Sequence, residues 1–251
     1  MEQTIAYYEK WLGQESCLAT DGLKFIYSEE RNKVQAGYAD PFDLYIWVDD
    51  QRIIVSYGKR IDDKISVLKE RLLPKQTLLE IMAIIEELFV LPVNHNIKYG
   101  FSGTLADNHQ NNAKNLTHND YADYEMFFKT MHPNAKDVSW LQEYFDEMVA
   151  EKLCVGLYED GKVVCCTDAP MIPYLVDAVQ EIGVNTLSDY QQKGYAFSVC
   201  QQAVKNILEN KKEPQWSTVV NNIGSQKLAE RIGFKKLADV LTVTLSGVNE
   251  S

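Results

Sequence analysis

The stretch that decides the fold is Glu181-Ile-Gly-Val-Asn-Thr-Leu-Ser-Asp-Tyr-Gln-Gln-Lys-Gly-Tyr-Ala196, in which an apolar run leads through a short polar loop into a helical pattern. The run over residues 178–187 predicts a strand, and apolar residues recur at helical spacing over 194–208. A phosphate at a helix N-terminus is bound by unpaired backbone N–H groups and by the positive end of the helix dipole. The segment therefore predicts a phosphate-binding bend between a strand and a helix.

The side chains of this bend suit such a ligand. Gly194 lets a phosphate approach without a Cβ in the way, and the small Ala196 keeps the helix start clear. Gln191 and Gln192 can add side-chain donors, and Lys193 a positive charge. Taken by spacing alone, the same residues also fit an ordinary turn before a helix.

Working outward, the chain from Thr117 to residue 245 alternates helices and strands. Thr117 and Asp120 form a start that resembles a capping box, and Glu159-Asp160-Gly161 is a hairpin turn. The patterns predict helices at 121–131, 138–149, 194–208 and 224–232, and strands at 153–158, 162–167, 178–187, 216–220 and 240–245. A strand, a helix and a parallel strand imply a right-handed crossover, so the fold class is α/β (α+β mixed) with a mixed sheet.

The first hundred residues have patterns of their own. Helices are predicted at 5–12 and 78–88, and strands at 25–28, 44–48 and 53–57. Residues 100–115 are rich in Gly, Asn, Asp and Thr, which is typical of a linker or a long surface loop. We therefore expect a smaller N-terminal α/β region over 1–100 and a second domain over 101–251.

A second motif stands at the expected distance from the bend. Asn222-Ile-Gly-Ser-Gln-Lys-Leu228 follows an apolar strand and precedes Gly233-Phe234. Together with Gln191, Gly194 and Ala196, this segment resembles the GNAT superfamily of N-acetyltransferases, in its two-domain branch with an extra N-terminal region. The resemblance covers about 130 residues. It implies a mixed, mostly antiparallel central sheet with two splayed parallel strands, flanked by helices.

The resemblance also implies a cofactor and its contacts. Acetyl-coenzyme A, as co-substrate, would lie where the strand over 178–187 parts from the strand over 216–220. A backbone N–H near Thr186 would hold the thioester carbonyl and stabilise an oxyanion. The residues expected to bind the cofactor are Val184, Thr186, Leu187, Gln191, Gln192, Lys193, Gly194, Tyr195, Ala196, Asn222 and Ser225. For Asn222, an N-cap of the short helix is an equal interpretation.

The catalytic groups follow less directly. Attack by a neutral amine requires a general base, and Glu181 is the leading candidate. Counted without gaps, Gln180 is closer to the family position, and a one-residue offset reverses the face of a strand; a bulge would restore it. A solvated or ion-paired Glu181 is the alternative. The family's usual Tyr acid corresponds to Ala229 here, which leaves Tyr190 or Tyr195 as substitutes.

The composition limits the classes of partner that we expect. The net charge of −11 opposes binding to nucleic acid or an anionic membrane and suits a cationic amine. Five cysteines without a C-x-x-C indicate buried free thiols in a reducing cytoplasm. No signal peptide or membrane span is evident, and the four histidines have no metal-ligand spacing. We expect a cytoplasmic protein without a metal; the oligomeric state is not predicted.

Three functions remain after this reading. The first is an N-acetyltransferase that transfers an acetyl group from acetyl-coenzyme A to a primary amine of a small molecule, by direct attack in a ternary complex. The alternative is a non-catalytic acyl-coenzyme A-binding or regulatory module, which Ala229 and the uncertain base favour. A nucleotide-binding protein fits less well, because the bend matches neither phosphate-loop pattern.

Overall fold

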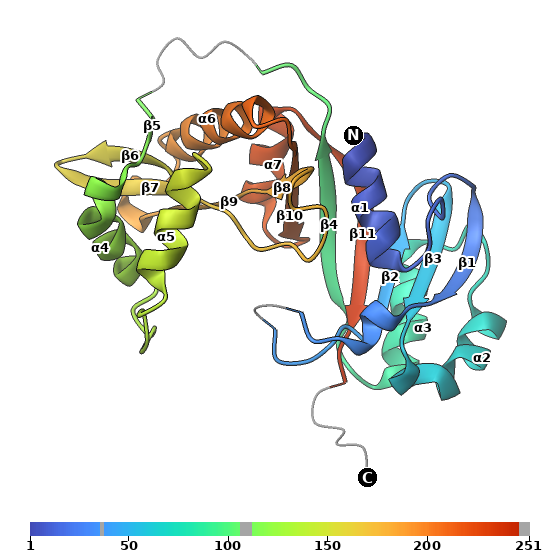
Figure 1. Ribbon diagram of the computed structural model, residues 1–251. Coiled ribbons are helices and arrows are strands. Elements are labelled where there is room, and N and C mark those ends of the chain that lie inside the picture. Colours follow the sequence, from blue (N-terminus) through green and yellow to red (C-terminus); the bar gives the residue numbers. More distant parts are fainter. Residues whose placement is uncertain (36–37, 106–111, 246–251) are drawn as a thin grey trace.

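The larger of two sheets is mixed and has seven strands, which come from both the N-terminal and the C-terminal parts of the chain (Figure 1). The computed structural model describes residues 1–35, 38–105 and 112–245. The strand order is β1-β3-β2-β11-β4-β10-β8, in which β1–β3 and β8–β10 are parallel pairs and the others antiparallel. Its strands are β1 (Gly22–Tyr27), β2 (Leu44–Val48), β3 (Arg52–Tyr57), β4 (Asn94–Phe101), β8 (Val179–Glu181), β10 (Glu213–Val219) and β11 (Phe234–Val243).

A second, four-stranded antiparallel sheet lies beside it, with the order β5-β6-β7-β9. Its strands are β5 (Lys114–Asn115), β6 (Val155–Glu159), β7 (Lys162–Asp168) and β9 (Gly183–Thr186). The expected GNAT-like architecture, a mixed sheet with splayed parallel strands flanked by helices, is confirmed.

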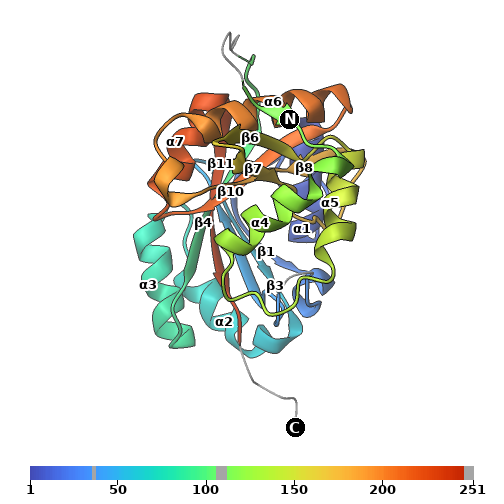
Figure 2. The ribbon, with the colours of Figure 1, turned by 90° about the vertical axis from the view of Figure 1, so that its left-hand side faces the viewer.

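Seven helices cover these sheets within the described residues, and Figure 2 shows α4 and α5 in front of the strands. They are α1 (Glu2–Leu12), α2 (Asp62–Arg71), α3 (Leu78–Phe89), α4 (Tyr121–Met131), α5 (Leu141–Ala150), α6 (Tyr195–Glu209) and α7 (Ile223–Ile232). Successive side chains of β2 point to opposite faces: Leu44 and Ile46 pack with α2 and α3, whereas Tyr45 and Trp47 pack with α1. The five cysteines are buried and unbridged, as predicted.

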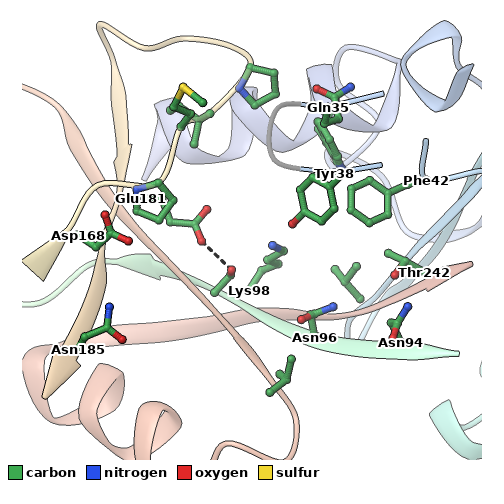
Figure 3. A pocket seen from close by; sticks show the side chains of 18 of the residues that line it. Gln35, Tyr38, Phe42, Asn94, Asn96, Lys98, Asp168, Glu181, Asn185 and Thr242 are labelled. Carbon is green, nitrogen blue, oxygen red and sulfur yellow. Dashed lines mark hydrogen bonds between the residues drawn. The ribbon is translucent and has the colours of Figure 1, made fainter. Parts of the chain in front are cut away.

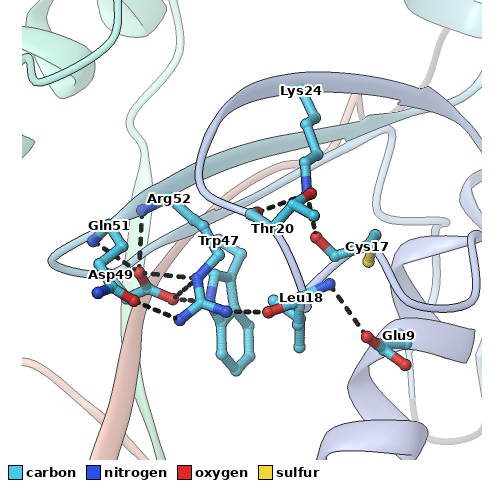
Figure 4. Close-up of polar contacts among 9 residues, drawn as sticks. All are labelled: Glu9, Cys17, Leu18, Thr20, Lys24, Trp47, Asp49, Gln51 and Arg52. Carbon is cyan, nitrogen blue, oxygen red and sulfur yellow. Dashed lines mark hydrogen bonds and ion pairs between the residues drawn. The ribbon is translucent and has the colours of Figure 1, made fainter.

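The β2–β3 hairpin is closed by the carboxylate of Asp49 (Figure 4). It accepts hydrogen bonds from the Trp47 indole N–H and from the backbone N–H groups of Gln51 and Arg52, each at 2.9 Å. The Arg52 guanidinium donates in turn to the Leu18 carbonyl, so the loop after α1 is fixed to this hairpin. These contacts hold α1 against the sheet, where its aromatic residues line the cavity described below.

Strand β4 was not predicted, and it lies at the centre of the molecule. It pairs with β10 on one side and β11 on the other. Ile97 and Tyr99 are buried, whereas Asn96 and Lys98 point to the other face. This alternation was the available signal for a strand. The large sheet thus draws strands from both sides of residue 100, and the domain boundary there remains a prediction.

Two strand predictions were wrong in their extent. The strand expected over 178–187 is broken at Ile182: β8 pairs with β10, and β9 pairs with β7 in the other sheet. The last strand, expected at 240–245, is β11 and begins directly after Gly233. It lies between β2 and β4 rather than at an edge, because it pairs with β4 over 234–242 and with β2 over 239–243. Part of the expected 100–115 linker, residues 106–111, is outside the described residues.

Candidate acyl-coenzyme A site

The site begins where β8 and β10 part. Their parallel pairing ends at Glu181 and Gln215, and the Ile182 N–H makes the last bond, 3.1 Å to the Gln215 carbonyl. After Ile182 the chain turns to β7 and pairs with it through β9. One edge of β9 therefore faces a V-shaped opening whose other arm is the end of β10. This is the predicted splay.

Two backbone N–H groups of β9, those of Val184 and Thr186, lie on its open edge. The Leu187 N–H donates to the Val164 carbonyl of β7 at 3.0 Å. Because strand residues alternate, the N–H groups of Val184 and Thr186 point away from β7, toward the opening. Leu187 differs from the expectation, since its carbonyl also accepts a bond from the Tyr190 N–H. It can offer a ligand only its side chain.

The predicted bend presents a row of free amides. Among the described residues, no protein acceptor is bonded to the N–H groups of residues 192–197; the first bond of α6 is from Ser198 to the Gly194 carbonyl, 3.2 Å. No side chain caps this helix start. Gln192 and Gly194 have left-handed φ values of 62° and 84°. Left-handed residues within a turn aim successive N–H groups at one point, which is a geometry that binds anions.

Side chains around the bend leave it open. A Cβ on Gly194 would meet no atom within 4 Å, so that position faces free space. Gln191 donates to the Thr186 carbonyl at 3.3 Å and fixes the bend to the end of β9. Lys193 lies 3.7 Å from Glu159, and the Tyr195 hydroxyl donates to the same carboxylate. Gln192 and Ala196 are placed with them at the helix start.

The second motif forms the start of helix α7. Asn222 is its N-cap, with Oδ1 accepting the Ser225 N–H at 3.1 Å. The Ser225 hydroxyl accepts the Trp216 indole N–H at 3.0 Å, which ties α7 to β10. The cap interpretation of Asn222 is therefore confirmed, and its amide nitrogen has no partner among the described residues.

Glu181 faces a cavity on the α1 side of the large sheet. Its Oε1 accepts the Ser217 hydroxyl of β10 at 2.7 Å. Gln180 points elsewhere and is buried, with its amide bonded to the Glu181 carbonyl at 3.0 Å. The break at Ile182 provides the irregularity that the one-residue offset required. Glu181 is thus the carboxylate of this strand that reaches the cavity.

The cavity measures about 1430 Å³, and its walls contain residues of α1, of strands from both sheets and of helices α4 and α5. Figure 3 shows part of this lining. It borders both arms of the opening, since Asn185 of β9 and Val219 of β10 line it. Ligand pockets for small molecules span roughly 300–1,000 Å³. The space is sufficient for an acceptor together with the end of a pantetheine arm.

The walls are aromatic and uncharged over much of their area. One wall carries Tyr7, Tyr8, Trp11, Tyr38, Phe42 and Tyr45, and the other Tyr124, Phe127, Phe128, Trp140 and Tyr144. Burial, and then the Glu181 carboxylate, raise the pKa values of the Tyr7, Tyr8 and Tyr38 phenols, so these stay protonated at neutral pH. A low-dielectric wall of this kind strengthens the few charges within it.

Sequence comparisons agree with this geometry. Residues 143–239 match the family described as GNAT acetyltransferase. This span holds the opening, the bend and α7. Over these residues the chain is similar to GNAT acetyltransferases. A comparison with curated proteins finds no significant match.

Solved structures share the GNAT fold at low identity. An acetyltransferase from the GNAT family of Colwellia psychrerythraea is 16% identical, with a TM-score of 0.52, over 64% of this chain and 61% of that one. A GCN5-related N-acetyltransferase from Sphaerobacter thermophilus is 13% identical, with a TM-score of 0.50, over 64% of this chain and 56% of that one. This chain therefore spans less than two thirds of either relative's length.

The chain departs from the GNAT pattern at the acid position. Ala229 is fully buried, so no group there reaches the opening. The substitutes do not reach the cavity either: Tyr190 donates to Asp160 at 3.2 Å, and a hydrogen bond to Glu159 raises the pKa of Tyr195 to about 12. Neither residue lines the cavity. Both hydroxyls are held by the β6–β7 turn instead.

Several residues at the candidate site were not predicted. They are Lys98, Asn94 and Asn96 of β4, Asp168 of β7, Ser217 of β10, and Tyr38 and Phe42 of the N-terminal region. Of these residues, only Asn96 and Lys98 could have been found from the sequence, because they alternate with the apolar Ile97 and Tyr99 as strand residues do. Within the described ranges, no three His, Cys, Asp or Glu side chains form a metal cluster, and no helix is long and apolar enough to cross a bilayer.

Proposed function

We propose that this chain is an N-acetyltransferase that transfers the acetyl group of acetyl-coenzyme A to a primary amine of a small molecule. The observation that supports it most is the combination of a strand opening with a bend of unpaired amides at its end. A diphosphate on the amides of residues 192–196 would leave the pantetheine arm to run along the open edge of β9. The Val184 and Thr186 N–H groups would serve the arm and the thioester carbonyl.

In this proposal the acceptor occupies the cavity and meets the thioester at the opening. Glu181 takes the proton of the amine, and the Ser217 hydroxyl orients its carboxylate. The amine nitrogen then attacks the thioester carbon, a C–N bond forms and the C–S bond breaks. With Ala229 at the usual acid position, coenzyme A leaves as a thiolate without help from that helix.

The proposal assigns the two halves different tasks. Residues 101–251 would bind the cofactor, and residues 1–100 would supply one aromatic wall of the acceptor cavity together with β4. The acceptor is a small molecule rather than nucleic acid, since a net charge of −11 opposes the latter.

The bend is tested with a matched pair of glycine variants. Gly194 and Gly22 both have left-handed φ values and open space at the Cβ position. Gly194→Leu and Gly22→Leu should each cost about 1–3 kcal/mol of stability through backbone strain. Only Gly194→Leu should lose the rise in melting temperature that coenzyme A gives the unmodified chain. An equal coenzyme A shift in both variants would refute the bend as the cofactor site.

A second measurement separates the enzyme from a binding module. Release of free thiol from acetyl-coenzyme A is followed across a panel of primary amines. Turnover with any of them supports the transferase. A clear rise in melting temperature with coenzyme A, together with no thiol release in the presence of any amine, would favour the non-catalytic module. The buried Ala229 is the observation that suggests this module.

A further inference from the structure

The cavity contains charges of both signs, and its cation is unpaired. Lys98 of β4 is the single lysine or arginine among the described residues that line it. Its cross-strand neighbours are Ser217 and Ala238, so it lies on the same face of the sheet as the Ser217 hydroxyl. Among the described residues, Lys98 has no hydrogen-bond or ion-pair partner. A half-buried ammonium without an anion is costly unless a ligand supplies one.

Two carboxylates stand at the other side of the same space. Glu181 uses one oxygen for Ser217, and Asp168 uses one for the Tyr144 hydroxyl and the Ala169 N–H. The second oxygen of each has no partner among the described residues. Asp168 reaches this position because its strand neighbour is Gly183, where a Cβ would lie 3.0 Å from the Asp168 Cβ.

Aromatic side chains line the cavity on either side of these charges. The rings of Tyr38 and Phe42 pack edge to face with their centroids 4.7 Å apart. The Trp140 ring centroid lies 5.6 Å from that of Phe128 and 5.8 Å from that of Tyr144. Figure 3 shows Glu181 and Asp168 on one side of the cavity, Tyr38 and Phe42 on the other, and Lys98 drawn between them. Such rings pack best against another ring or an apolar chain.

We propose that the acceptor is an aromatic amino acid, a molecule that carries an amine, a carboxylate and a flat apolar side chain together. This rests on the proposed function. Glu181 receives the amine, Lys98 pairs with the carboxylate, and the aromatic walls enclose the side chain. Lys98 lies directly across from Ser217 in the β4–β10 pair, and Ser217 donates to Glu181, so the two charged side chains lie on one face of the sheet and line the same cavity. The bond changes are those given above, and the carboxylate of the acceptor takes no part in them.

The test compares L-phenylalanine with 2-phenylethylamine, which lacks only the carboxylate. In the full chain with acetyl-coenzyme A, kcat/KM for phenylalanine should exceed that for phenylethylamine at least about tenfold, as expected for a charge-assisted contact. Lys98→Met should remove this preference by lowering kcat/KM for phenylalanine, and Lys98→Arg should retain it. Lys235→Met, an exposed lysine in the same sheet, is the control and should behave as the unmodified chain.

Each other outcome counts against one proposal or the other. Equal use of the two amines, or a preference unaffected by Lys98→Met, overturns the amino-acid acceptor and leaves the transferase intact. L-alanine turned over as well as phenylalanine would overturn the aromatic part. If no amine is acetylated, the transferase fails, and binding still decides the inference. With coenzyme A present, phenylalanine should then raise the melting temperature of the unmodified chain and not of Lys98→Met, and a shift in neither refutes it.

Discussion

At the scale of single residues, Glu181 is the group whose chemistry depends most on its position. One oxygen is held by Ser217, and the other faces the cavity without a partner among the described residues. We predict that Glu181→Gln lowers kcat roughly 100- to 10,000-fold, the usual contribution of a general base, with coenzyme A affinity unchanged. Steady-state kinetics with acetyl-coenzyme A and the best amine measure the effect.

The neighbouring Gln180 provides the control for this variant. It lies in the same strand but is buried and bonded to the backbone. Gln180→Glu should therefore not rescue the loss in Glu181→Gln, although it restores the net charge. Recovery of kcat in the double variant would show that the strand can shift by one residue and that the break at Ile182 does not fix its face.

At the scale of elements, the cap of α7 should act on stability. The Asn222 side chain accepts the Ser225 N–H, which satisfies one of the free donors of the first turn. Asn222→Ala should lower the free energy of unfolding by about 1 kcal/mol, and Asn222→Ser should restore most of it. Chemical denaturation measures the stability, and calorimetry the coenzyme A affinity. A serine variant that regains stability but still binds coenzyme A tenfold more weakly would indicate a direct contact with the cofactor.

The start of α4 should make stability depend on pH. Partial burial acts to raise the pKa of Asp120, but hydrogen bonds from the Thr117 N–H, the Lys114 ammonium and the Thr117 and Tyr158 hydroxyls hold it well below its usual range. A lowered pKa stabilises the fold above the unfolded value near 3.9, and this contribution is lost as pH falls toward the folded value.

Asp120→Asn should thus lower the free energy of unfolding by about 1–2 kcal/mol at pH 7. The difference in this free energy between the variant and the unmodified chain should shrink below about pH 4. Urea denaturation at several pH values measures both. Asp177→Asn, at an exposed carboxylate, is the control and should differ little at any pH. A pH-independent difference for Asp120→Asn would contradict the assignment.

At the scale of the whole molecule, β4 makes the two halves depend on each other. It supplies the pairing partner of both β10 and β11, so a fragment of residues 103–251 would expose two long strand edges. We expect neither the 1–102 nor the 103–251 fragment to unfold cooperatively alone, and the two co-expressed fragments to reconstitute the coenzyme A-dependent melting shift. A 103–251 fragment that melts cooperatively and binds coenzyme A by itself would contradict this.

Local patterns determined much of the structure of residues 112–245. The bend at 191–196, the Thr117 capping box and the helix that ends at Gly233 each depend on neighbouring residues, and each is found as predicted. Glycine and capping residues act on the backbone within one turn, which is why the sequence alone places them. The assignment of the fold class succeeded for the same reason.

Only the tertiary structure decided the cavity that we propose as the acceptor site. Lys98, Asp168 and Tyr38 are far apart in the chain and share no local pattern, and they line one cavity only in the folded chain, in which β4 lies between β10 and β11. The break at Ile182, which turns Glu181 toward the cavity, likewise results from two strands competing for one segment: β10 before Ile182 and β7 after it. Strand pairing joins residues across the whole chain, and its partners are chosen by the packing of the complete fold rather than by the residues on either side.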